Sequence, residues 1–166
     1  MHTKKEVYLR NFIFGVEDSI VSTVGLLSGV VIGGVSREVV ILTGIVLIFV
    51  EAFSMGIGSF LSEYAAEEMV TQRAIPRKVW AVGGAIMFIS YIVAGLIPLA
   101  PYLFLSFVFP AFLVSILLSL VVLFVLGMIG GAIGGISTLR RGLRMFTLGG
   151  FAILIGALAA RFVALL

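Results

Sequence analysis

The sequence predicts an all-α integral membrane protein with five transmembrane helices, and its composition and length support this fold class. Of the 166 residues, 61% are hydrophobic and only 11% are charged, and the mean hydropathy is +1.29. Soluble domains average about half apolar and about a quarter charged residues, so a soluble globule is excluded. One spanning helix needs about 20 apolar residues, so the chain has room for about five, in a single domain.

The apolar runs predict spans at about residues 12–34, 39–62, 79–100, 110–135 and 145–166. The charged N-terminal start precedes a long apolar run without a small-residue cleavage site, which predicts a retained span rather than a signal peptide. The polar residues 63–78 follow the second run, and we expect them to continue that helix into water until Pro76 stops it. Pro98 and Pro101 follow the third run, and we expect its helix to end and turn back there.

Basic residues predict the orientation of the chain. All of the 11 Lys and Arg residues except Arg37 and Arg161 fall on the side of the predicted bundle that holds the N terminus. Cytoplasmic loops carry the excess of Lys and Arg, so the N terminus is predicted in the cytoplasm and the C terminus on the opposite side. The membrane would be the cell membrane of a prokaryote or a vacuolar-type membrane of a eukaryote. The positive charge therefore indicates topology, and no nucleic-acid partner is expected.

Glycines at four-residue spacing predict close helix packing in spans one and four. They are Gly25, Gly29 and Gly33, and the pairs Gly127 with Gly131 and Gly130 with Gly134. Asp18 and Ser22 share the helical face of Gly25 and Gly29, so the acidic face and the packing face of span one coincide. Packing inside the chain and packing against a second copy both remain open. The odd number of spans argues against two equal inverted halves, so symmetry would come from a homodimer.

Three acidic residues lie inside apolar runs: Glu17, Asp18 and Glu51. A carboxylate at membrane depth is costly unless it is paired, protonated or facing water, which makes each a functional candidate. Asp18 and Glu51 are the stronger two. Glu17 lies within two turns of Arg10 and about 100° around the helix from Asp18, so an interfacial anchor is its alternative interpretation.

Span two carries a polar stripe whose members step by four residues and so share one helical face. The stripe consists of Glu51, Met55, Ser59, Glu63 and Glu67. Its order of acid, thioether, hydroxyl and acids predicts a cation path from the membrane interior to water, and a soft sulfur ligand favours a transition metal. Ordinary packing is the alternative for Met55. A solvated helix face is the alternative for Glu63, Glu67 and Glu68, which would otherwise concentrate cations at the opening.

Enzymatic chemistry finds little support in the sequence. Cysteine is absent and the single histidine is His2 in the N-terminal tail, which argues against tetrahedral zinc and iron–sulfur sites. The hydroxyls of span one have no basic side chain beside them for a hydrolase triad. Asp18 is the one Asp, whereas an intramembrane lipid transferase would need several. We therefore expect a transporter with no permanently bound cofactor.

Four segments, in family order, resemble the vacuolar iron transporter family, which includes the yeast calcium-sensitive cross-complementer and the plant nodulin-21-like proteins. They are NFIFGVEDSIVSTVGLLSGV, GIVLIFVEAFSMGIGSFLS, GLIPLAPYLF and FVLGMIGGAIGGISTLRRGLRMFTLGG. The resemblance implies five transmembrane helices, a homodimer with the ion path between subunits, and exchange of cytosolic ferrous iron, often manganese too, for protons. It also implies that Asp18 is the family's acid of span one and Met55 its pathway methionine.

The chain departs from the family pattern in three places. Ser19 follows the acid where the family has Gly, and Leu47 occupies the usual position of the span-two glutamate. We interpret Glu51, one turn later, as a shifted replacement. Many members also insert a Glu- and Met-rich metal-binding domain between spans two and three, where this chain has only residues 63–78. We interpret the acids and methionine there as its remnant: Glu63, Glu67, Glu68 and Met69.

The sequence thus predicts a proton-coupled antiporter that exports a divalent transition metal, with Fe²⁺ as the first candidate and Mn²⁺ as the second. Its expected partners are the lipid bilayer, the metal ion and a second copy. Asp18, Glu51 and Met55 would bind the metal, with a secondary set of Glu17, Ser22, Ser59, Glu63, Glu67 and Glu68. Two alternatives remain: a membrane scaffold that binds metal without transporting it, and a passive divalent cation channel.

Overall fold

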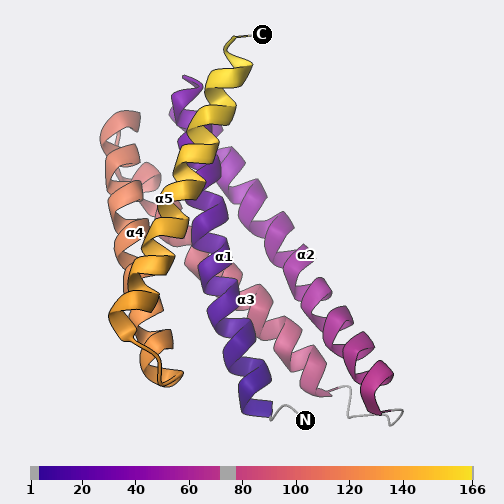
Figure 1. The fold of residues 1–166 in the computed structure, drawn as a ribbon. Helices are drawn as coiled ribbons and strands as arrows, with labels where there is room; N and C mark the ends of the chain where they lie inside the picture. The colour runs from indigo at the N-terminus through magenta and orange to yellow at the C-terminus, as the bar shows by residue number, and fades with distance from the viewer. Residues whose placement is uncertain (1–3, 72–77, 166) are drawn as a thin grey trace.

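The computed structural model describes the backbone of residues 4–71 and 78–165 and the side chains of residues 4–66 and 79–165. Within this part the chain forms α1 (Lys4–Ile32), α2 (Arg37–Thr71), α3 (Lys78–Phe104), α4 (Val108–Ile133) and α5 (Thr138–Val163) (Figure 1). Each of these five helices is long and apolar enough to cross a membrane. The predicted all-α membrane fold is therefore confirmed.

The helices extend beyond the apolar runs at several ends, because hydrophobicity marks the length in lipid and backbone hydrogen bonds continue into water. α1 begins at Lys4, well before the predicted start of span one at residue 12. α2 continues past Glu63 to Thr71, as expected for a helix that leaves the membrane. The expectation that Pro76 stops this helix lies outside the described residues.

The expectation that the third helix ends at Pro98 and Pro101 is wrong, since α3 continues through both prolines to Phe104. Proline interrupts helices by removing an N–H and crowding the preceding turn. Spanning helices tolerate it where neighbouring side chains satisfy freed backbone groups. The Ser115 hydroxyl of α4 donates to the Pro98 carbonyl at 2.6 Å, a contact that ties this part of α3 to α4.

Arg37, the first residue of α2, closes the end of α3. Its Nε donates to the Tyr102 carbonyl at 2.7 Å and its Nη2 donates to the Leu103 carbonyl at 3.0 Å. The last carbonyls of a helix have no partner within the helix, so this guanidinium acts as a cap from a neighbouring element. The start of α2 is thereby tied to the end of α3.

α1 is the central helix of the bundle (Figure 1). It packs against α3 and α5 most extensively and also contacts α2 and α4. α2 packs mainly on α3, and α4 packs mainly on α5, so two helix pairs flank α1. Large apolar side chains of α2, α4 and α5 remain exposed, among them Phe53, Leu117 and Phe151. These outer faces are suited to contact with lipid.

Glycines allow close approach of α1 and α5. A Cβ atom on Gly29 would lie 2.7 Å from the Gly156 carbonyl oxygen, and one on Gly25 would lie 3.0 Å from the Ala152 carbonyl oxygen. The glycines of α4 serve the same purpose inside the chain, since a Cβ on Gly127 would lie 2.7 Å from a backbone oxygen of α5. Both glycine patterns of the sequence therefore contribute to packing within one chain.

We expect Gly29→Ala to destabilise the protein, because the added Cβ forces α1 away from the α5 backbone. Gly150→Ala is the matched control, since a Cβ there meets nothing within 4 Å. Alanine generally stabilises a helix interior by about 0.5–1 kcal/mol relative to glycine, so the control should unfold at an equal or higher temperature. Thermal unfolding in detergent micelles measures both, and a Gly29→Ala midpoint at or above the wild-type midpoint would contradict the packing argument.

We expect Arg37→Gln to lower the free energy of unfolding by about 1.5–3 kcal/mol, the range for hydrogen bonds to charged groups. The variant loses the guanidinium that caps two α3 carbonyls. Arg161→Gln removes the same charge from the last turn of α5 and should have little effect. Chemical denaturation followed by circular dichroism distinguishes the two, and equal stability of both variants would refute the capping role.

Candidate functional site

A cleft of about 960 Å³ lies between α1 and α2, at the end of the bundle that carries the N terminus. Its walls come chiefly from the first half of α1 and the second half of α2, with one residue each from α3 and α5 and with Gly130, Ile133 and Gly134 at the end of α4. Four of the sequence-predicted site residues line it: Glu17, Met55, Ser59 and Glu63. α1 and α2 run antiparallel, so successive turns of the α2 stripe meet successively deeper positions of α1.

Two polar contacts between α1 and α2, an ion pair and a hydrogen bond, lie near the opening of the cleft. The Glu63 carboxylate pairs with the Arg10 guanidinium, and Glu63 is the better shielded partner, with 14% of its side chain exposed against 56% for Arg10. One turn deeper, the Ser59 hydroxyl donates to Asn11 Oδ1 at 2.7 Å. Asn11 is buried, and its Nδ2 has no partner among the described residues. The charge of Glu63 is therefore compensated in this state.

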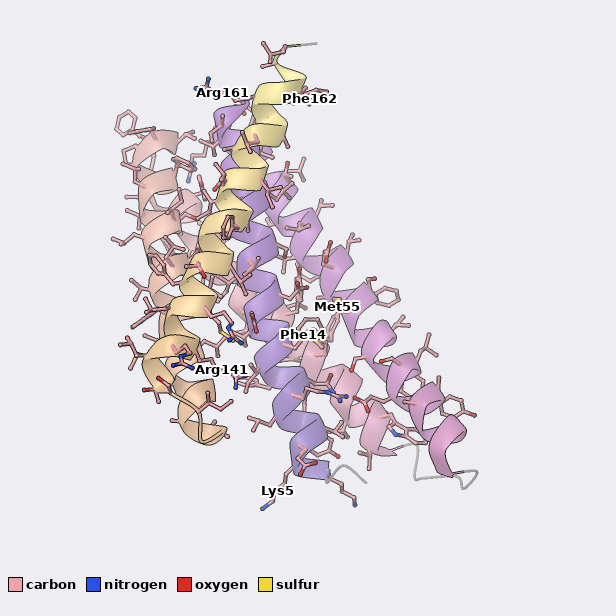
Figure 2. All side chains as sticks on the ribbon, viewed as in Figure 1. Lys5, Phe14, Met55, Arg141, Arg161 and Phe162 are labelled. Atoms are coloured by element: carbon pink, nitrogen blue, oxygen red, sulfur yellow. The ribbon has the colours of Figure 1, made fainter. Side chains whose placement is uncertain are left out.

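The middle of the cleft combines a thioether, an aromatic ring and a carboxylate. Met55 and Phe14 both line it, and Figure 2 shows them in the space between α1 and α2. Glu17 lines the same cleft from α1 and lies within electrostatic range of Arg141, near the start of α5. Arg141 also donates from Nη1 to the Gly130 carbonyl at 3.3 Å. Glu17 thus faces a basic residue of α5, a partner that the sequence interpretation did not identify.

The deepest polar contacts lie one turn beyond Met55. Asp18 of α1 and Glu51 of α2 are close enough for their charges to repel. Tyr91 of α3 contacts both helices here: its hydroxyl donates to Glu51 Oε2 at 3.3 Å and is 2.6 Å from Ser22 Oγ. The Ser19 hydroxyl donates to the Tyr91 backbone carbonyl at 2.6 Å. Three helices therefore meet at a small polar centre.

Tyr91 was missed by sequence reasoning because it lies within an apolar run and carries no charge. Its side chain is fully buried, which is uncommon for a tyrosine unless its hydroxyl has a partner. The pair Ser90 and Tyr91 in the middle of an otherwise apolar span was the available signal. The Tyr91 hydroxyl adds a third oxygen-bearing group to the polar centre, beside the carboxylates of Asp18 and Glu51.

The remaining predicted residues are placed only in part. The side chains of Glu67, Glu68 and Met69 lie outside the described residues. Within the described side chains, no three His, Cys, Asp or Glu residues form a cluster that could hold a metal ion. One chain instead brings two carboxylates together at depth, and a cation or a proton between them would relieve their repulsion.

We expect Tyr91→Phe to destabilise the protein by about 1–2 kcal/mol, because it leaves the Ser22 hydroxyl and the Glu51 carboxylate without this partner. Tyr64→Phe is the matched control, since Tyr64 is 37% exposed and its ring contact with Trp80 is retained. Thermal unfolding at fixed detergent concentration compares the two variants. Equal midpoints would show that the Tyr91 hydroxyl contributes nothing to the polar centre.

Comparison with known proteins identifies the chain at the level of its family. The profile of the VIT family matches residues 9–83 and 73–161, two segments that overlap where α2 connects with α3. Together they reach from α1 into α5. No curated protein matches the chain. The family is one of membrane transporters rather than enzymes, and its match confirms the resemblance found in the sequence. The chain belongs to the VIT family and is a multi-pass integral membrane protein of five spanning helices.

Proposed function

We propose that this protein is a homodimeric, proton-coupled antiporter that moves a divalent transition metal, Fe²⁺ first and Mn²⁺ second, out of the cytosol. Membership of the VIT family indicates transport of metal ions across a membrane. The observation that carries the finer proposal is the juxtaposition of Asp18 and Glu51 just beyond a cleft that Met55 lines. The cleft would admit the ion, and the two acids would bind it.

The stripe on α2 supplies a path of suitable length. Glu63 and Glu51 are separated by about 18 Å along an ideal helix axis, over half of the roughly 30 Å thickness of a hydrocarbon core. A cation at the opening would compete with Arg10 for Glu63 and then pass the Ser59 hydroxyl and the Met55 sulfur. It would arrive where two carboxylates and the Tyr91 hydroxyl offer oxygen ligands. The thioether favours a transition metal such as Fe²⁺ over Mg²⁺ or Ca²⁺, and the carboxylates are ligands that also suit Mn²⁺.

Charge balance provides the coupling to protons. With a divalent ion bound, both carboxylates remain ionised and their repulsion is offset. After the ion leaves, two desolvated like charges face each other, and proton uptake is the remaining way to relieve them. Exchange of one metal ion for protons at the same two carboxylates would therefore couple the two fluxes. Tyr91 and Ser22 would hold Glu51 in place during both states.

A second copy would complete the site and enclose the path. One chain contributes two carboxylates and one thioether, and a two-fold axis beside the α2 stripe would double that set. Glu51 would then act in place of the family glutamate, whose usual position is occupied by Leu47, since Glu51 lies within electrostatic range of Asp18.

The direction of transport follows from the orientation of the chain. The cleft opens at the end of the bundle that holds the N terminus and most Lys and Arg residues. The positive-inside rule assigns that end to the cytoplasm. The cleft would therefore receive metal from the cytosol, and protons would enter from the opposite side.

We expect Asp18→Asn and Met55→Ala to slow Fe²⁺ transport by about tenfold or more, equivalent to about 1.4 kcal/mol in the barrier. Transport is measured in proteoliposomes with an imposed pH gradient and a trapped metal-sensitive dye. Met128→Ala and Glu38→Gln are matched controls, since neither residue lines the cleft or belongs to the polar centre of Asp18, Glu51 and Tyr91. Wild-type rates in both site variants would overturn the assignment of the site.

The same experiment separates the two alternative functions. Flux that is indifferent to the pH gradient would identify a passive cation channel. Saturable metal binding without flux would identify a metal-binding scaffold. Competition between Fe²⁺, Mn²⁺ and other divalent ions in these vesicles determines the preferred metal.

A further inference from the structure

A second cavity, of about 320 Å³, lies at the start of α5 and is lined by three arginines: Arg140, Arg141 and Arg144. Residues three and four apart on a helix are neighbours, so these like charges gather on one side of α5. Arg140 and Arg144 are exposed, and neither has an acidic partner within ion-pair distance in the described part of the chain. Glu17 is the one acidic residue among the described residues that line this cavity, so three arginines leave it with a surplus of positive charge.

The other walls of this cavity are mostly apolar, from Ile136, Met145 and Leu148. Immediately beyond the arginines, α5 becomes apolar and is the least buried of the five spanning helices. Leu143 is 50% exposed and Phe151 is 62% exposed, so this surface continues away from the cavity towards the interior of the membrane. A ligand that fits both parts has an anionic head and a long apolar tail.

We propose that Arg140, Arg141 and Arg144 bind the phosphate headgroup of an anionic phospholipid, whose acyl chains lie along the exposed apolar face of α5. Arginine binds phosphate oxygens in bidentate geometry with charge-assisted hydrogen bonds. Basic pockets between spanning helices at the membrane surface are typical sites for anionic lipid headgroups. Figure 2 shows Arg141 at the end of the bundle towards the N terminus, beside the connection between α4 and α5.

The lipid site shares a wall with the cation cleft, because Glu17 and Arg141 line both cavities. A bound phosphate would compete with Glu17 for Arg141. The Glu17 carboxylate would then be available to a cation in the cleft. This regulatory step rests on the proposed transport function, whereas binding of the lipid does not.

Lipid binding is tested first, on purified protein by native mass spectrometry with phosphatidylglycerol and phosphatidylcholine at equal concentrations. The wild type should retain phosphatidylglycerol preferentially, and Arg144→Gln or Arg140→Gln should reduce that retention by about tenfold. Arg161→Gln removes one charge from the other end of α5 and should retain the lipid as the wild type does. Equal retention by Arg144→Gln and Arg161→Gln would overturn the site. Displacement of phosphatidylglycerol by millimolar inorganic phosphate would also overturn it, in favour of a soluble anion.

Regulation is tested second, by Fe²⁺ flux in phosphatidylcholine vesicles with and without phosphatidylglycerol. The anionic lipid should raise the flux of the wild type and of Arg161→Gln several-fold, and that of Arg144→Gln much less. If Asp18→Asn slows flux but phosphatidylglycerol changes no variant, the regulatory step fails and the transport function stands. If no variant transports metal, the mass-spectrometric result still decides whether the lipid site exists.

Discussion

The antiparallel register of α1 against α2 determines where each polar side chain of the cleft lies. Arg10 pairs with Glu63, Ser59 donates to Asn11, and about two turns further inwards Asp18 and Glu51 are close enough for their charges to repel. Lipid offers no hydrogen-bond partner, so each polar group at this depth must be satisfied inside the bundle or face water in the cleft. A shift of one helical turn between α1 and α2 would break all of these contacts at once. The register is therefore specified by polar groups in a bundle whose other contacts are mainly apolar.

α5 depends on a different kind of contact. Glycines of α1 let the α5 backbone approach closely near Gly156, and glycines of α4 fix the turn that leads into α5. Together these contacts set the height at which Arg141 faces Glu17. Two cavities with different lining chemistry, one acidic with a thioether and one basic, thereby come to share a wall. Small residues that carry no charge thus determine which charges lie together.

The sequence was sufficient for the five helices and for the face of α2 that lines the cleft, because both follow from hydrophobic runs and helical periodicity. It could not identify Tyr91, Asn11 or Arg141 as neighbours of the acidic residues, since helix periodicity says nothing about which helices pack together. The prolines of α3 misled the interpretation for a similar reason. Their effect on the helix depends on packing within the bundle and on the membrane, which a local propensity does not include.

The cap that Arg37 forms on the end of α3 has a mechanical consequence for the cleft. It fixes the start of α2 to the end of α3, at the end of the bundle remote from the N terminus. From there α1 and α2 diverge towards the end with the N terminus (Figure 1). Glu51 lies about 21 Å along α2 from Arg37, and Glu63 lies about 18 Å further along the helix. If α2 pivots near Arg37, a small change in the separation of Asp18 and Glu51 therefore becomes a larger displacement of Glu63 at the opening.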